Sequence, residues 1–170
     1  MKTLKKLILI FLLVGFIGCH EDNDSNRTEV ENYIELLKSN KYMGTDIPLL
    51  SETDISTLLK YRNDRHVITN FPRNPLTSTV LSECEVGVFL LWSIESIRTI
   101  SESHFLTGRF PSQNPILLLK HSENSGFIYT REAYEIISNA YWEWWENNKN
   151  KNFDEFKNID PLENTEYCWQ

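Results

Sequence analysis

Glycine is scarce in this chain, with 6 residues among 170. The sequence has no glycine-rich phosphate loop and no Gly-x-Ser-x-Gly motif, so it offers neither a phosphate cradle nor a serine nucleophile on a tight turn. None of the four histidines lies three to five residues from another, and no cysteine pair has zinc-ligand spacing. The sequence therefore predicts no metal site and no cofactor, and it contains no motif that names an enzymatic reaction.

Basic residues are also few, 17 Lys and Arg against 24 Asp and Glu. Three of the basic residues and none of the acidic ones precede residue 19, so residues 19–170 carry a net charge of 14 − 24 = −10. Nucleic acid would repel such a surface, and no basic stripe interrupts it. We expect no nucleic-acid partner.

The N-terminal segment is typical of an export signal. A basic stub, Met1–Lys6, precedes the apolar run Leu7–Ile17, which is shorter than the ~20 residues that a membrane-spanning helix requires. The residues Phe16-Ile17-Gly18-Cys19 resemble the lipobox of bacterial lipoproteins. This resemblance implies a signal peptide over residues 1–18, cleavage before Cys19, and acyl chains such as palmitate on that cysteine. The alternative is a plain secretory signal with an unmodified Cys19.

Residues 19–27 have no apolar side chain after Cys19, so they are predicted to form a flexible tether. Their acidic cluster resembles the surface-export signal of Bacteroidales-type lipoproteins, although a solvated linker explains it equally well. The resemblance implies a Gram-negative envelope protein, anchored by lipid to the outer membrane and exposed at the cell surface. The leaflet and the oligomeric state stay open.

Two cysteines remain beyond Cys19, namely Cys84 and Cys168. An even pair in an oxidising compartment favours a disulfide, which would close a loop of ~84 residues and contribute roughly 4 to 5 kcal/mol. The alternative is a buried thiol at Cys84 and an unpaired thiol at Cys168.

Helical periodicity predicts an all-α fold of about four to five helices in one domain, residues 28–170. The expected helices cover residues 28–40, a short segment after Ser51, residues 79–102 and residues 130–148. The third is apolar on nearly every side and is predicted to be central. Two similar elbows, at Asn74-Pro75 and Asn114-Pro115, favour stacked helical hairpins of the HEAT type as one arrangement.

The layout resembles a family of Bacteroidales lipoproteins of unknown function, some of whose members are described as similar to helical-repeat domains. The residues that carry this resemblance are Leu91–Arg98, Arg109–Pro111 with Asn114–Leu117, and Trp144–Lys149. The resemblance supplies no catalytic motif.

Two sets of side chains are candidates for function. Glu95, Arg98 and Glu102 share one stripe of the central helix, where they predict either a partly buried ion pair or, less favoured, a catalytic carboxylate. Tyr141, Trp142 and Trp145 predict an aromatic binding surface, unless the C-terminal tail with Phe153, Phe156 and Trp169 folds over them.

These observations lead to an ordered set of expectations for function. The first is a non-enzymatic domain for protein interaction or envelope assembly, held to a membrane by lipid on Cys19. The alternative is a glycan-binding module that uses Trp142 and Trp145, and an enzyme ranks third.

Overall fold

The computed structural model describes residues 28–99, 109–121 and 126–170. In these ranges the helices are α2 (Glu29–Lys38), η2 (Glu52–Asp54), α3 (Ile55–Lys60), α4 (Val86–Thr99), α5 (Arg131–Asn148) and η3 (Phe153–Glu155). The strands are β1 (Val67–Ile68), β2 (Cys84–Glu85), β3 (Leu117–Leu119) and β4 (Tyr167–Trp169). The predicted all-α fold is therefore wrong, because helices and two small antiparallel sheets are combined in one mixed α/β structure.

The first and last long helices form where local sequence signals predict them. Thr28 caps α2 through the backbone N–H of Glu31, and the Glu31 side chain accepts the N–H of Thr28 in return. The Thr130 side chain caps α5 by accepting the backbone N–H of Ala133. A capping side chain satisfies a backbone donor that has no partner within the helix. The sequence within a few residues is therefore enough to place the N-terminal end of each of these two helices.

The central helix α4 begins seven residues later than predicted. Cys84 and Glu85 pair with Ile68 and Val67 as antiparallel strands, and α4 starts only at Val86. The Arg73 Nε also donates to the carbonyl of Leu81 at 3.0 Å, which holds the preceding segment in a non-helical path. Partners that lie 8 to 18 residues away along the chain thus override the helical pattern of this segment. Residues 100–102, the predicted end of this helix, lie outside the described ranges.

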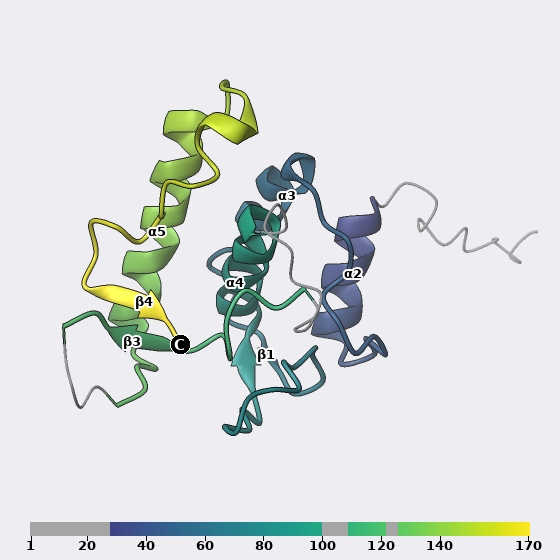
Figure 1. The fold of residues 1–170 in the computed structure, drawn as a ribbon. Helices are drawn as coiled ribbons and strands as arrows, with labels where there is room; N and C mark the ends of the chain where they lie inside the picture. The colour runs from purple at the N-terminus through teal and green to yellow at the C-terminus, as the bar shows by residue number, and fades with distance from the viewer. Residues whose placement is uncertain (1–27, 100–108, 122–125) are drawn as a thin grey trace, which may run out of the picture.

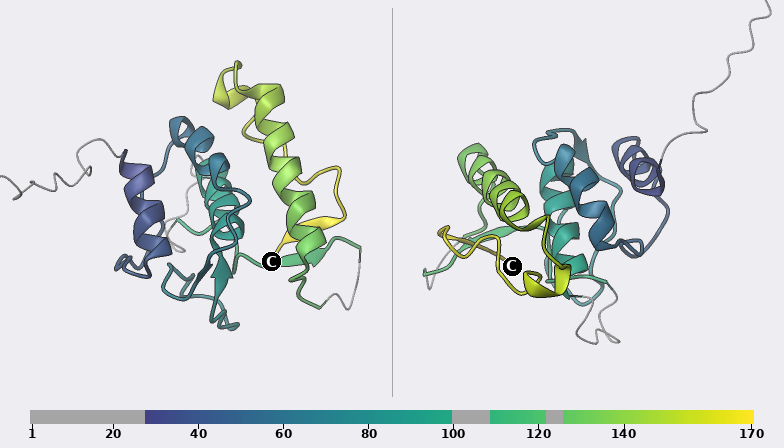
Figure 2. Two further views of the ribbon diagram at one scale, coloured as in Figure 1. Left: turned by 180° about the vertical axis from the view of Figure 1, so that it is seen from behind. Right: turned by 90° about the horizontal axis from the view of Figure 1, so that it is seen from above.

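Helix α4 lies between α2 and α5, with α3 against it, in each of the three ribbon views (Figures 1 and 2). Its apolar side chains on all sides account for this central place, since Phe89, Trp92 and Ile94 are completely buried. Trp92 also donates its Nε1–H to the Oγ of Ser112 at 2.8 Å, which satisfies the polar atom of a buried ring. The core of the domain is therefore built around this helix, as the sequence predicts.

The C-terminal tail is docked through strand pairing. In β3 and β4, Leu117 pairs with Trp169 and Leu119 with Tyr167, beside one end of α5 (Figure 1). The apolar residues 116–119 are compatible with either a helical turn or a strand, and the structure forms the strand. It bonds to residues about 50 positions later in the chain, so no local signal determines the choice.

The two Asn-Pro elbows start no helix, so the stacked-hairpin arrangement is wrong. The two elbow segments instead contact each other: Asn74 Nδ2 donates to the carbonyl of Ser112 at 3.0 Å, and Asn114 Nδ2 donates to Thr77 Oγ1 at 2.8 Å. Both asparagines are buried. The two similar motifs therefore join two loops, and neither asparagine caps a helix.

Candidate functional site

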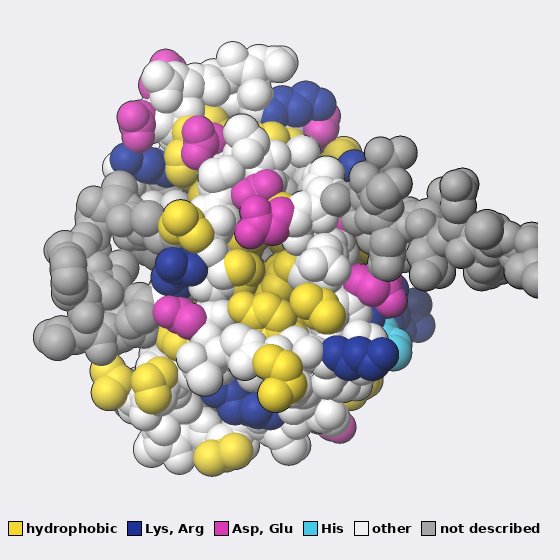
Figure 3. All heavy atoms as spheres, turned by 90° about the vertical axis from the view of Figure 1, so that its right-hand side faces the viewer, with side chains coloured by type: hydrophobic (Ala, Val, Ile, Leu, Met, Phe, Trp, Pro, Cys, Tyr) yellow, Lys and Arg dark blue, Asp and Glu magenta, His cyan; other side chains and the backbone are white. Residues whose placement is uncertain are grey.

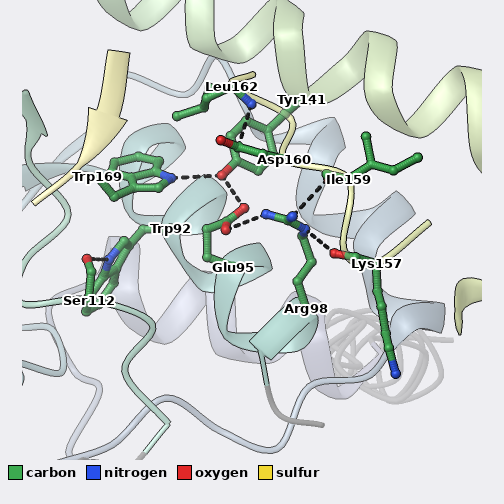
Figure 4. Close-up of polar contacts among 10 residues, drawn as sticks. All are labelled: Trp92, Glu95, Arg98, Ser112, Tyr141, Lys157, Ile159, Asp160, Leu162 and Trp169. Carbon is green, nitrogen blue, oxygen red and sulfur yellow. Dashed lines mark hydrogen bonds and ion pairs between the residues drawn. The ribbon is translucent and has the colours of Figure 1, made fainter. Parts of the chain in front are cut away.

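A buried polar cluster joins α4, α5 and the C-terminal tail (Figure 4). Arg98 Nη1 donates to Glu95 Oε2 at 2.5 Å, and only 9% and 12% of these two side chains are exposed. The predicted ion pair is thus confirmed. Arg98 also donates to the backbone carbonyls of Lys157 and Ile159, each at 2.8 Å, so it fastens the tail. Glu102 lies outside the described residues.

The second carboxylate oxygen of Glu95 accepts a short hydrogen bond from the hydroxyl of Tyr141. The same hydroxyl accepts the Nε1–H of Trp169 at 2.8 Å. Burial raises the pKa of Glu95, while the adjacent Arg98 guanidinium and the Tyr141 hydroxyl oppose that rise. Burial also raises the pKa of Tyr141 well above its usual value, so its hydroxyl stays protonated. Arg98, Glu95, Tyr141 and Trp169 are therefore joined by one continuous series of hydrogen bonds.

A cavity of about 330 Å³ adjoins this cluster, and its walls include Glu95, Asp160 and Cys168. A catalytic carboxylate needs an oxygen free to reach a substrate. Both oxygens of Glu95 already accept hydrogen bonds from protein side chains. The arrangement is suited to holding the tail against α4 and α5.

The predicted aromatic surface is not formed. Tyr141 is completely buried, and Trp145 packs against Phe156 with ring centroids 6.2 Å apart. Trp169 of the tail contacts Tyr141, so the tail folds over Tyr141 and Trp145, as the alternative predicts for these two rings. Trp142 is 37% exposed, but the guanidinium of Arg62 stacks on it at 4.3 Å. Trp145 is half-buried against Phe156, and Arg62 covers part of Trp142, so the two rings do not form the open platform that the glycan-binding alternative requires.

The cysteines do not form the predicted disulfide in this structure. Cys84 and Cys168 are both free thiols, one in β2 and the other in β4, and each strand belongs to a different sheet. Cys84 is buried, and burial raises the pKa of its thiol far above the usual value. Cys19, the predicted lipidation site, lies outside the described residues.

Two features are absent from the described residues. No cluster of three or more His, Cys, Asp or Glu side chains among them is arranged to hold a metal ion. No helix in those same ranges has the length and apolar character needed to cross a bilayer.

An apolar groove of about 590 Å³ is the feature that the sequence analysis missed. Its walls come from the loop after α2, the loop after β1 and the segment that begins at Arg109. Figure 3 looks onto the α2 side of the molecule, where apolar side chains gather at the centre of the face among acidic and basic ones. The groove is lined mainly by Tyr42, Met43, Phe71, Pro72, Pro75 and Phe110.

Charge is sparse along this groove. Arg73 lies over the ring of Phe71 at 4.2 Å, and Asp46 accepts the N–H groups of Ile47 and Arg109. Met43 at the rim is 88% exposed, and Leu49 in the same loop is 72% exposed. The apolar content of the loop around Phe71 was the only signal for this groove in the sequence, because its three walls meet only in the folded chain.

The fold defines a small mixed α/β domain with no recognisable catalytic arrangement among its described residues. A family model described as "Domain of unknown function (DUF4943)" matches residues 24–170, and the chain belongs to this family. No curated protein and no solved structure matches the chain.

Proposed function

We propose that this protein is a lipid-anchored lipoprotein of the Gram-negative envelope, of the Bacteroidales type, whose domain binds a protein partner in an envelope assembly. The leader, the lipobox-like Phe16–Cys19 and the acidic tether support the anchor and its outer-membrane address. More than one acyl chain is needed for stable anchoring, and a lipobox cysteine carries such a set.

The apolar groove is the observation that carries the interaction role. It combines aromatic and proline side chains with a methionine that is almost fully exposed. An apolar concavity with exposed side chains at its rim is typical of a surface that a partner covers. Methionine adapts its shape to a partner more readily than branched side chains do.

The anchor is tested by growing cells with a clickable palmitate analogue. The wild-type chain should take up the label and fractionate with the outer membrane, whereas Cys19→Ala should do neither. Equal labelling of both chains, or an unlabelled wild-type chain, would show that Cys19 carries no lipid.

The interaction role is tested by placing a photo-crosslinking amino acid at Met43 in intact cells. We expect one defined cross-linked product from this position. The matched control is Glu143, an exposed residue of α5 that does not line the groove. The same products from both positions, or none from Met43, would remove the groove as the binding surface.

A further inference from the structure

A polar cleft of about 320 Å³ lies between the loop after α3 and one face of α5. This loop, residues 62–65, forms one wall, and Arg131, Tyr134 and Asn139 of α5 form the other. The cleft is separate from the apolar groove, because the two share no lining residue. Its size is at the lower end of the range for small-molecule sites, ~300 to 1,000 Å³.

The loop that forms the first wall is held in place from several directions. Asp64 accepts Lys38 Nζ of α2 at 2.8 Å, and its carbonyl accepts the N–H of Gly87 in α4 at 2.8 Å. Asn63 accepts the hydroxyl of Ser138 in α5 at 2.6 Å. A wall fixed to three helices loses little conformational entropy when a ligand binds.

Arg62 provides a cation without a carboxylate partner among the described residues. Its Nη1 donates to the carbonyl of Leu59 at 3.0 Å, its guanidinium lies over Trp142, and its buried Nε has no hydrogen-bond partner in the described part of the chain. The other two arginines of the cleft differ, since Arg65 contacts Glu85 at 3.6 Å and Arg131 contacts Glu135 at 2.7 Å. Because Nε is enclosed and Nη1 is bonded to Leu59, the remaining nitrogen of the Arg62 guanidinium, Nη2, is the group that can contact an anionic group of a ligand.

The remaining walls favour a monoanion that carries hydroxyl groups. Glu85, Glu135 and Asp64 also line the cleft, and their charge disfavours a doubly charged phosphate. The Tyr134 hydroxyl and the Asn139 amide form no hydrogen bond to other described residues, and the Asn63 amide nitrogen likewise forms none within those ranges. Ligand hydroxyls both donate and accept, so this mixed set of polar groups complements them.

We infer that this cleft binds a hexuronic acid, free or at the end of a short oligosaccharide. The carboxylate contacts Arg62, and the ring hydroxyls contact Tyr134, Asn139 and Asn63. This inference goes beyond the proposed interaction role and does not depend on it.

The test is a calorimetric titration of the purified full chain with D-glucuronate, D-glucose and acetate in parallel. We expect binding of glucuronate at least about tenfold tighter than that of glucose or acetate, since only glucuronate engages both the guanidinium and the amide groups. Equal affinity for acetate would overturn the role of the hydroxyls, and equal affinity for glucose would overturn the role of the carboxylate. Absence of glucuronate binding would overturn the site.

Variants locate the binding within the molecule. Arg62→Gln should weaken glucuronate binding at least about tenfold, and Asn139→Ala, an exposed change that spares the fold, should weaken it about threefold. The matched control is Lys60→Gln, which removes an exposed cation of α3 that does not line the cleft. Unchanged affinity in both cleft variants, or an equal loss in the control, would place the ligand elsewhere and overturn the inference.

Discussion

Arg98 holds the C-terminal tail through several hydrogen bonds at once. Its guanidinium donates to Glu95 on its own helix and to the carbonyls of Lys157 and Ile159 in the tail. Because the side chain is 9% exposed, water cannot replace these bonds when one partner is removed. The residue is therefore a structural tie between α4 and the tail.

Arg98→Met should lower the free energy of unfolding by about 3 kcal/mol, because it leaves Glu95 buried without its counter-charge and two carbonyls without donors. Chemical denaturation measures this loss. The matched control is Arg131→Gln, which breaks an exposed pair with Glu135 and should cost less than about 0.5 kcal/mol. Similar losses in the two variants would contradict the buried tie.

Glu95 should make stability depend on pH in a defined direction. Below the pKa that Glu95 has in the unfolded chain, its carboxyl is protonated in both states. As pH rises from there through the raised folded pKa, the unfolded chain loses the proton more readily than the folded chain does. The contribution of Glu95 is thus fully present at low pH and declines as pH rises. The difference in unfolding free energy between the wild-type chain and Glu95→Gln should fall from about pH 4 toward neutral pH. A difference that grows with pH would contradict the raised pKa.

The two thiols should differ in reactivity. Cys84 is 8% exposed with a raised pKa, whereas Cys168 is half-buried, so a thiol reagent should label Cys168 in the folded chain and Cys84 only after unfolding. Mass spectrometry of the labelled peptides measures this order. A disulfide-linked peptide pair from protein isolated without reductant would contradict it.

At the scale of the elements, the start of α4 depends on a close approach of two backbones. The N–H of Gly87 donates to the carbonyl of Asp64 at 2.8 Å, and a Cβ on Gly87 would overlap the carbonyl oxygen of Arg62. Glycine is required at this position for space and not for an unusual backbone angle.

Gly87→Ala should therefore destabilise the domain by about 2 kcal/mol, although alanine has the higher helix propensity. A thermal unfolding scan tests this. The control is Gly126→Ala, where an added Cβ meets no atom within 4 Å and stability should change little. A stabilised Gly87→Ala chain would mean that the loop after α3 is free to move.

Among the elements, α2, α3 and α5 could be predicted from the sequence, because caps and apolar spacing within the element determine their ends. The start of α4 and the strands β1 to β4 could not. Each strand is two or three residues long and pairs with a segment at least 16 residues away, so its stability comes from a partner that no local window contains.

At the scale of the whole molecule, the last four residues close the structure. Strand β4 pairs with β3, Trp169 donates to Tyr141, and Gln170 exchanges backbone hydrogen bonds with the segment around Ile116. The C-terminus thereby connects the sheet, α5 and the elbow loops.

A chain that ends at Glu166 should lose hydrogen-exchange protection in Leu117–Leu119, above all at Leu118, whose hydrogen-bonded strand partner Cys168 is gone. Amides in the middle of α2, which has no contact with this sheet, should keep most of their protection. Protection at Leu117–Leu119 equal to that of the full chain would show that β3 is stable without β4.

The candidate sites also differ in whether the sequence alone could predict them. The Glu95–Arg98 pair could be predicted because both residues lie on one helix three positions apart. The apolar groove and the polar cleft could not, since each collects side chains from three separate segments of the chain.

The sequence by itself determined the predicted export signal, the acidic charge of residues 19–170, the central place of α4 and the ends of α2 and α5. All of these depend on composition or on neighbours within a few residues. Only the tertiary structure decided the two sheets, the burial of Tyr141, the contact of Trp145 with the tail and the positions of the groove and the cleft. These features depend on contacts between distant segments, which form only when apolar burial brings the segments together.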